Sequence, residues 1–286
     1  MILPGSIRGN LTLKKKLNQL SEAKLKGYNK ERLKHSKVLY EASDKILLLG
    51  EGNFSFSSAL CKMFGNGSNV WATSYDSEDV LKQKYSDDCA NHIEFVKGCG
   101  GKVFYGIDGT KLEKHRKTFL LAHNNEAKEQ EGFVQNSFGS NFRNTNEIFF
   151  DKIVINFPHC GLGIKDQRKN ILANQKLLSG ILKSARSLAH PKTGQLHITI
   201  KSGLPYELWR VAALAKEEGH WHQTSCIPFN PNLYPGYEHR RTLGFEAGIS
   251  SSQNVEIKEK YPKTYVFSLS SNVTSKNTEA AKNNKE

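Results

Sequence analysis

The segment 45–60, KILLLGEGNFSFSSAL, places an apolar strand, a glycine-containing turn and an amphipathic helix in direct succession. Gly50 and Gly52 allow backbone angles that a Cβ would forbid, and their lack of side chains lets a ligand lie against the turn. The helix begins near Phe54, where its first N–H groups are available to a ligand. The segment therefore predicts a nucleotide-type cofactor pocket.

A second predicted strand, residues 70–75, ends next to Asp76, an acidic residue placed where it can bind a ribose hydroxyl. Dinucleotides and S-adenosylmethionine share this arrangement. Ser55 stands where the dinucleotide fingerprint has its third glycine, and Glu51 would repel a diphosphate. A cationic sulfonium tolerates that carboxylate, so these residues favour S-adenosylmethionine over a nicotinamide cofactor.

Strand and helix signals alternate after residue 38, which predicts a mostly parallel sheet. The expected strands are residues 46–49, 70–75, 102–106, 152–156, 195–201, 224–227 and 264–269. The expected helices are residues 55–63, 78–84, 92–97, 111–122, 167–188 and 206–218. Seven strands with a hairpin-like end match the Rossmann-like α/β sheet of class I methyltransferases, with helices on both faces, better than a six-stranded dinucleotide domain.

Charge and composition divide the chain into three expected parts. Residues 1–37 form a basic arm, residues 38–270 a cofactor-binding domain with a polar, disordered insertion at 123–147, and residues 271–286 a disordered polar tail. The net charge of +13 predicts a polyanionic partner, and the arm's Lys14, Lys15 and Lys16 are candidate phosphate contacts. The same basic run also fits a solvated helix or a localisation signal.

The cysteines and the apolar runs bear on metal and membrane partners. Five cysteines are scattered without a Cys-x-x-Cys pair, a pattern that disfavours both zinc and disulfide frameworks. Apolar runs stay well below the roughly 20 residues that a membrane-spanning helix requires. We therefore expect a soluble intracellular monomer with no metal and no membrane partner.

Polar residues that follow the predicted strands are the candidates for binding and catalysis, because open parallel sheets bind ligands beyond the carboxyl ends of their strands. Asp108 follows the third strand, where it could accept a hydrogen bond from an adenine amine or cap the next helix. Asn156, Phe157, Pro158 and His159 follow the fourth strand. Phe157 could stack on a base, Asn156 could orient it, and His159 could accept a ring proton or shape the loop through a hydrogen bond.

A later loop, PFNPNLYPGYEHRRTLG at residues 228–244, interleaves aromatic and basic side chains between proline and glycine residues. Tyr234, Tyr237, His239, Arg240 and Arg241 suit a flipped or single-stranded nucleotide. The alternative is a surface loop that packs its own tyrosines.

The motifs GEGNFSFS, ATSYDS, GIDGT, DKIVINFPHCG and YPGYEHRRT, in this order, resemble the large-subunit rRNA uridine-N3 methyltransferase family over residues 38–269. The resemblance implies a Rossmann-like class I fold, S-adenosylmethionine as cofactor, ribosomal RNA or a pre-ribosomal particle as partner, and a nuclear, nucleolar location, with the cytoplasm as the alternative. It places the cofactor at Gly50, Glu51, Gly52, Asn53, Phe54, Asp76 and Asp108, and the target base at residues 156–159.

Uridine N3 becomes nucleophilic only after it loses its proton, so such an enzyme needs a base or an anion-stabilising pocket. His159, Arg240 and Arg241 are the candidates for this role. Because N3 is buried in Watson–Crick pairs, the target must be unpaired or flipped. The alternatives are a methyltransferase of the same fold that acts on another RNA or a protein, and a non-catalytic RNA-binding ribosome-assembly factor.

Overall fold

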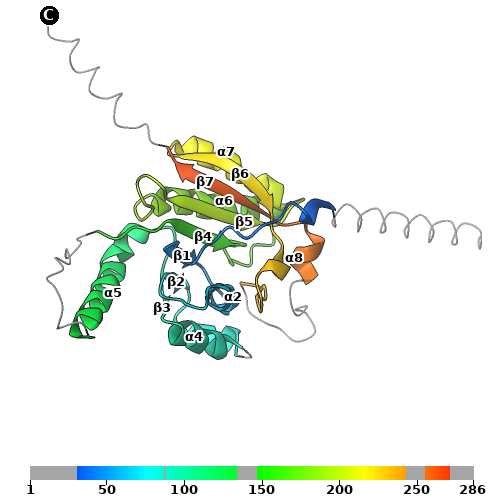
Figure 1. Ribbon diagram of the computed structural model, residues 1–286. Helices are drawn as coiled ribbons and strands as arrows, with labels where there is room; N and C mark the ends of the chain where they lie inside the picture. Colours follow the sequence, from blue (N-terminus) through cyan, green and yellow to red (C-terminus); the bar gives the residue numbers. More distant parts are fainter. Residues whose placement is uncertain (1–30, 87, 134–146, 243–254, 271–286) are drawn as a thin grey trace, which may run out of the picture.

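The computed structural model describes residues 31–86, 88–133, 147–242 and 255–270 (Figure 1). Within them, a seven-stranded sheet has the strand order β3-β2-β1-β4-β5-β7-β6. The strands are β1 (Ile46–Leu49), β2 (Val70–Thr73), β3 (Lys102–Phe104), β4 (Lys152–Asn156), β5 (Gln195–Ile200), β6 (Trp221–Pro228) and β7 (Lys263–Leu269). The helices are α2 (Ser55–Phe64), α3 (Glu78–Lys84), α4 (Cys89–Gly98), α5 (Leu112–Phe133), α6 (Gln167–Ala185), α7 (Val211–Glu218), α8 (Val255–Glu259) and the short 3-10 helices η1 (Tyr206–Trp209) and η2 (Pro231–Leu233).

The sheet confirms the predicted Rossmann-like class I architecture. The strands β1 to β5 pair in parallel, with β1 between β2 and β4. The strand β7 lies antiparallel between β5 and β6, so the expected hairpin-like end is the β6–β7 pair. This order brings the carboxyl ends of β1, β2 and β4 to one edge of the sheet (Figure 1).

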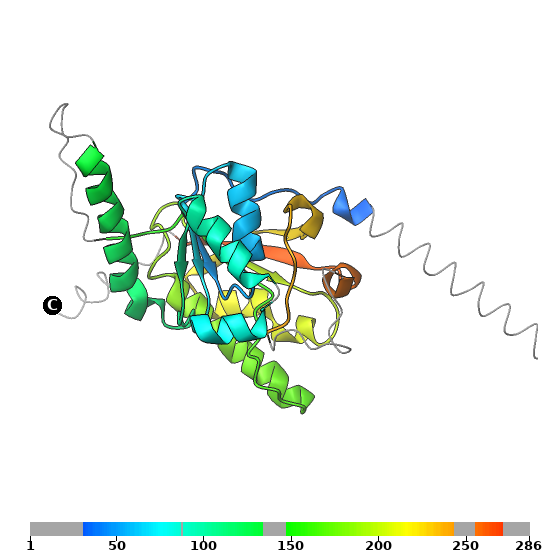
Figure 2. The same cartoon turned by 90° about the horizontal axis from the view of Figure 1, so that it is seen from below.

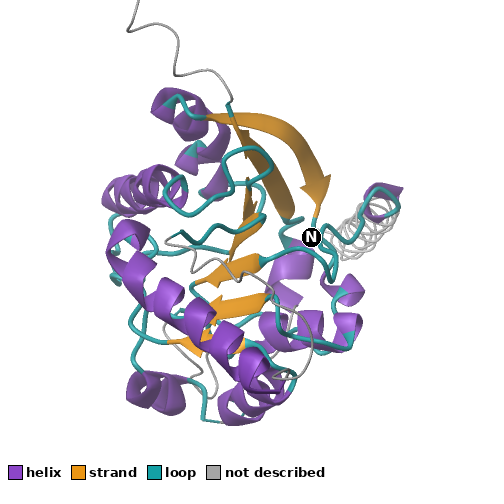
Figure 3. Ribbon diagram, turned by 60° about the vertical axis from the view of Figure 1, so that its left-hand side comes forward, coloured by secondary structure: helices purple, strands orange, loops and turns teal. Residues whose placement is uncertain are grey.

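Two separate apolar cores lie on the two faces of the sheet, because successive side chains of a strand point to opposite sides. In β1, Leu47 and Leu49 join the core formed with α5, α6 and α7. Ile46 and Leu48 join the core formed with α2, α3, α4 and α8. Figures 2 and 3 show helices on both sides of the sheet, as the sequence predicted.

The segments between the strands differ from the expected pattern in three places. The helix α5 continues to Phe133, so the first part of the expected disordered insertion is helical, and residues 134–146 lie outside the described residues. The expected helix at 206–218 is interrupted by the left-handed backbone of Arg210, φ 55°, which separates η1 from α7. The sequence patterns predicted neither α8 nor η2.

The basic arm and the polar tail are described only where they meet the domain. Lys14, Lys15 and Lys16 and the tail at 271–286 lie outside the described residues. The guanidinium of Arg32 donates hydrogen bonds to the carbonyl oxygens of Tyr261 and Pro262, so the last part of the arm packs beside the start of β7. None of the helices in the described ranges is long and apolar enough to cross a membrane.

The core around α5 gives a stability prediction. Phe119 is fully buried among Trp71, Phe104 and Phe150, whereas Leu121 on the same helix is 54% exposed. We expect Phe119→Ala to lower the free energy of unfolding by about 3–5 kcal/mol, because it removes a buried ring and leaves a cavity. Leu121→Ala should change it by less than about 1 kcal/mol. Urea unfolding followed by circular dichroism measures both, and equal losses would contradict this assignment of the core.

Candidate functional site

A cavity of about 1030 Å³ opens at the carboxyl ends of β1, β2 and β4. Its wall contains residues 49–53 of the turn after β1, Asp76 after β2, Asp108 after β3 and residues 156–162 after β4. A further wall comes from residues 237–240, which are distant in the sequence. The cavity therefore lies at the edge of the sheet where the sequence analysis expected a ligand.

The turn after β1 is shaped by positive backbone angles and a close ring contact. Gly50 has φ +67°, and a Cβ on Gly52 would lie 3.2 Å from the Tyr85 ring, so both positions require glycine. Phe54 also has a left-handed backbone, with φ 60°, and its ring is fully buried against Tyr105. The prediction that Phe54 lines the cofactor pocket is wrong, because its side chain points into the core beneath the turn.

Asn53 and Glu51 do line the cavity, and both side chains also stabilise the turn. The amide of Asn53 accepts a hydrogen bond from the Ser55 N–H at 3.2 Å and donates one to Asp88 at 2.9 Å. The Glu51 carboxylate accepts hydrogen bonds from the N–H and hydroxyl of Ser57, each at 3.1 Å. Burial raises the pKa of Glu51 to about 7, although the Ser57 hydrogen bonds oppose the shift.

Two more carboxylates, predicted from the sequence, face the same cavity. One oxygen of Asp76 forms an ion pair with the Lys84 ammonium at 2.7 Å. One oxygen of Asp108 accepts hydrogen bonds from the N–H and hydroxyl of Thr110, and the other pairs with Lys111 at 2.8 Å. These bonds lie within the turn that precedes α5, whose first residue is Leu112, so Asp108 stabilises the turn beside the two roles considered for it, helix cap and adenine contact. The adenine contact stays a prediction. The three carboxylates, two of them paired with lysines, offer acceptors to a ligand that carries hydrogen-bond donors.

Asn156 ends β4 with an amide that is not fully used by the protein. Its Oδ1 is buried and has no hydrogen-bond partner among the described residues, and the side chain lines the cavity. Buried acceptors are normally paired, so this atom is available to a ligand donor. The loop that follows is held by Asn174 of α6, whose Oδ1 accepts the Cys160 N–H at 2.9 Å.

His159 lies in that loop in a state that does not suit a general base. Its Nδ1 accepts a hydrogen bond from the Gly161 N–H at 3.0 Å, so in the neutral ring the proton is on Nε2. Burial lowers the pKa of His159, and the positive charges of Lys201 and Arg241 lower it further, so the neutral form prevails near pH 7. The nitrogen that is not used by the loop therefore carries the proton in this arrangement, as in the loop-shaping alternative. Proton acceptance by His159 would need the other tautomer and stays a prediction.

Phe157 and Pro158 complete the loop after β4. Phe157 has a left-handed backbone with φ 54°, and its N–H donates to the Thr199 carbonyl oxygen at 2.7 Å. Its ring packs against His239 at a centroid distance of 4.5 Å and against Phe229 at 5.6 Å. Both residues line the cavity, and the predicted stacking of Phe157 on a base stays a prediction.

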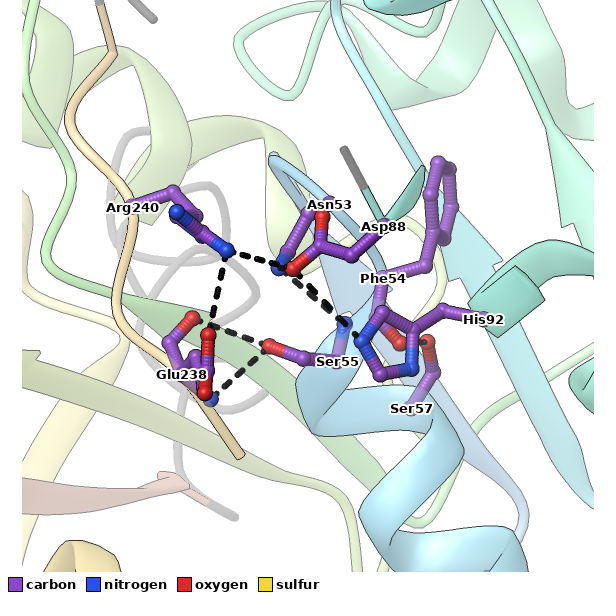
Figure 4. A network of polar contacts seen from close by, with 8 residues as sticks. All are labelled: Asn53, Phe54, Ser55, Ser57, Asp88, His92, Glu238 and Arg240. Carbon is purple, nitrogen blue, oxygen red and sulfur yellow. Dashed lines mark hydrogen bonds and ion pairs between the residues drawn. The ribbon is translucent and has the colours of Figure 1, made fainter. Parts of the chain in front are cut away.

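Arg240 holds residues 237–242 against the turn after β1 (Figure 4). Its guanidinium pairs with Asp88 at 2.6 Å and with Glu238 at 3.0 Å. In the same network, the Ser55 hydroxyl donates to the Glu238 carbonyl oxygen at 2.9 Å and accepts the Glu238 N–H at 3.0 Å. The charge of Arg240 is thus compensated by two carboxylates inside the protein, and the predicted contact of Arg240 with RNA stays a prediction.

The two tyrosines of this loop are also structural. Tyr234 is 3% exposed and packs on Phe56 at a centroid distance of 4.7 Å, and Tyr237 is 7% exposed and lies 5.2 Å from the same ring. Both rings pack inside the protein, as in the alternative of a loop that packs its own tyrosines. Tyr237 also contributes to the cavity wall, and the predicted stacking of the two tyrosines on a base stays a prediction. His239 is partly buried and lines the cavity, whereas Arg241 is exposed and stays a candidate RNA contact.

Three residues that sequence reasoning did not single out support the site. Tyr85 packs under Gly52 and donates its hydroxyl to the Arg241 carbonyl oxygen at 2.9 Å. Asp88 binds both Arg240 and Asn53, and Asn174 fixes the loop after β4. All three lie in or next to helices, where nothing in the local sequence pattern distinguishes them. Their role arises from contacts between distant parts of the chain.

The Arg240 network gives a second stability prediction with a neighbouring control. We expect Arg240→Ala to lower the free energy of unfolding by about 2–4 kcal/mol, since it leaves the carboxylates of Asp88 and Glu238 without their cation in a partly buried site. Arg241→Ala, at the adjacent exposed position, should change it by about 0.5 kcal/mol or less. Urea unfolding of both variants tests this. An effect of Arg240→Ala as small as that of Arg241→Ala would show that the ion pairs of Arg240 are dispensable for stability.

The raised pKa of Glu51 predicts a pH-dependent stability of the ligand-free protein. Because the pKa is about 7 in the folded protein and 4.5 in the unfolded chain, the contribution of Glu51 is present below pH 4.5 and is lost as the pH rises through 7. Glu51→Gln keeps an acceptor for Ser57 but does not ionise. Between pH 5 and 8.5, wild type should therefore lose on the order of 2–3 kcal/mol more than Glu51→Gln. Urea unfolding at several pH values tests this, and parallel profiles would contradict it.

Comparison with known proteins identifies the family. An uncharacterized protein of Arabidopsis thaliana is 33% identical over 72% of this chain and 85% of its own length. The 25S rRNA (uridine(2634)-N(3))-methyltransferase of Saccharomyces cerevisiae is 28% identical over 88% of this chain and 81% of its own length.

Among solved structures, a TehB-like SAM-dependent methyltransferase from Corynebacterium glutamicum aligns with a TM-score of 0.40 and 13% identity, over 88% of this chain and 100% of that one. Residues 47–241 match the family described as BMT5-like, rRNA (uridine-N3-)-methyltransferase BTM5-like. That match spans more than half of the 286 residues and includes the turn after β1, the loop after β4 and the Arg240 segment. The chain therefore belongs to the BMT5-like family of rRNA (uridine-N3-)-methyltransferases.

Proposed function

We propose that this protein uses S-adenosylmethionine to methylate N3 of a uridine in large-subunit ribosomal RNA. The observation that carries the proposal is the cavity at the carboxyl ends of β1, β2 and β4, whose wall contains Glu51, Asp76 and Asp108 and which lies within the segment that matches the family. The yeast relative, a 25S rRNA (uridine(2634)-N(3))-methyltransferase, aligns over 88% of the chain. The nucleolar location and the monomeric state stay predictions of the sequence.

The residues of the large cavity fit the proposed cofactor. S-adenosylmethionine supplies an electrophilic methyl group on a positively charged sulfur, and its remaining polar parts include an ammonium group, ribose hydroxyls and an adenine amine. These groups match a wall that contains Glu51, Asp76 and Asp108 and the unpartnered Oδ1 of Asn156. The carboxylate of Glu51 disfavours a diphosphate at the same turn, which argues against a nicotinamide dinucleotide.

The RNA substrate is supported by charge and by the position of the cavity. The chain has 41 Lys and Arg against 28 Asp and Glu, and a net charge of +13 favours a polyanionic partner. Arg241 is exposed next to the wall that closes the cavity and is placed to contact a phosphate. Because N3 lies in the pairing edge of uracil, the target must leave its helix before it reaches the cavity.

A substitution in the turn after β1 tests the assignment in cells. Gly52→Arg should abolish 3-methyluridine in large-subunit rRNA, because its Cβ would lie in tight contact, 3.2 Å, with the Tyr85 ring and its long charged side chain would occupy the cavity that Gly52 lines. Gly98→Arg is the matched control, since a Cβ at Gly98 meets no atom within 4 Å. Nucleoside mass spectrometry compares rRNA from cells that lack the gene and cells complemented with wild type or either variant.

The expected result is that wild type and Gly98→Arg restore 3-methyluridine and Gly52→Arg does not. Binding of S-adenosylmethionine to the purified proteins, measured by calorimetry, should follow the same order. Unchanged 3-methyluridine in cells without the gene would refute the rRNA assignment. Wild-type protein that does not bind the cofactor would favour a non-catalytic assembly factor.

A further inference from the structure

The helix α6 has only one sign of charge on its side chains. Its 19 residues include no Asp or Glu, and its exposed basic residues are Arg168, Lys169, Lys176 and Lys183. Pairs of opposite charge three or four residues apart, which stabilise many exposed helices, therefore cannot form within α6. Arg168 and Lys169 also lie in the first turn, where the helix dipole disfavours cations. This charge pattern does not serve the stability of the helix itself.

Three of these residues form a row along α6. Lys169, Lys176 and Lys183 are spaced seven residues apart, so they lie on one face of a helix with 3.6 residues per turn. The opposite face carries the buried residues, which include Leu178 and Leu182. At 1.5 Å per residue, the three lysines span about 21 Å along the helix. We call this row the basic face of α6.

The basic face borders the cavity at the carboxyl ends of the strands. Lys176 and Lys183 contribute to the cavity wall. Lys169 lies two turns closer to the start of the helix, in a half of α6 whose only buried residue among those described is Asn174. Figure 2 shows this first half, in yellow-green, projecting from the domain. The basic face therefore runs outward from the mouth of the cavity.

The charges of the basic face differ from the other cations of the cavity wall. Lys84 forms an ion pair with Asp76, and Arg240 pairs with two carboxylates. Within the part of the chain that the structure describes, the three lysines of the basic face form no ion pair. Their charges add up along one exposed surface, and such a surface attracts a polyanion.

We propose that the basic face of α6 binds backbone phosphates of large-subunit rRNA next to the target uridine and holds the strand across the mouth of the cavity. The inference rests on the proposed function and names the surface that positions the substrate. Each nucleotide carries one phosphate, so a face about 21 Å long meets several of them. Contacts of this kind fix the position of the RNA without reading its sequence, and a lysine ammonium suits them as a mobile point charge.

The test removes the three charges of the basic face together. The triple variant Lys169→Gln/Lys176→Gln/Lys183→Gln is compared with the corresponding triple Arg variant, which keeps the charges. The matched control removes three charges from exposed lysines outside α6 and outside the cavity wall, Lys97→Gln/Lys192→Gln/Lys216→Gln. Filter binding measures the affinity of the full-length proteins for large-subunit rRNA transcribed in vitro from the source organism's sequence, between about 50 and 300 mM KCl. Thermal unfolding and calorimetry with S-adenosylmethionine show whether each variant folds and binds the cofactor.

We expect the triple Gln variant of α6 to bind the transcript on the order of 10- to 100-fold more weakly at about 100 mM KCl. The slope of log K against log salt should become shallower by roughly 2 to 3, since each phosphate contact contributes about 0.7 to 0.9. The triple Arg variant and the control should stay close to wild type in both quantities. In methylation assays, the triple Gln variant should raise KM for the RNA with kcat nearly unchanged, because these contacts hold the substrate and its transition state equally.

Two outcomes would overturn the proposal. The first is a triple Gln variant with the affinity and salt slope of the control, which would make the basic face a solvated surface. The second is unchanged affinity for the transcript together with loss of 3-methyluridine in complemented cells, which would assign the basic face to an acidic protein partner.

Two further measurements keep the test decisive. If the triple Gln variant binds S-adenosylmethionine poorly, Lys169→Gln alone, outside the cavity wall, should still reduce the salt slope by about 0.7 to 0.9. An unchanged slope for this single variant would also contradict the proposal. Failure of the proposed function gives a different result, because wild-type protein would form no 3-methyluridine whatever its salt slope.

Discussion

The ion pairs of Arg240 determine the geometry on which the cavity depends. They join the turn after β1, the start of α4 and residues 237–242, which meet only in the folded chain (Figure 4). Ion pairs that are partly removed from water stabilise a protein only when their geometry is good and their other polar atoms are bonded. Here the Asn53 amide donates to the Asp88 oxygen that also pairs with Arg240, and the Ser55 hydroxyl bonds the backbone of Glu238. These bonds hold the segment in position as a wall of the cavity, although the second Asp88 oxygen is buried without a hydrogen-bond partner among the described residues.

The parts of the fold that the sequence predicted well are those governed by local chemistry. The strands β1 and β4 have the predicted bounds, because each contains an apolar run that is buried on two faces and neighbours on each side fix their register. The helix α3 begins and ends as predicted, with Ser77 as a side-chain cap at its first turn. For a related reason, the cavity is lined by four of the predicted candidates, Glu51, Asp76, Asp108 and Asn156. The end of a buried strand fixes the position of the next few residues.

The details that the sequence did not predict concern side chains whose environment comes from distant parts of the chain. Tyr234 and Tyr237 look like base-stacking residues in a loop, but the loop folds back over α2, and their rings pack on Phe56. The protonated nitrogen of His159 depends on one backbone N–H two residues away, which no residue pattern reveals.

Glu51 connects the stability of the protein with the ligand that its large cavity can hold. Burial makes the ionised carboxylate unfavourable, so the empty site at neutral pH carries a charge that the fold only partly compensates through Ser57. A cationic ligand provides the missing charge, whereas a diphosphate would add to the cost. The charge that lowers the stability of the folded protein thus lies on the residue that distinguishes the two classes of cofactor. Binding of a cationic cofactor would stabilise the folded protein by compensating this charge. A neutral residue at this position would give a more stable ligand-free protein with a less selective pocket.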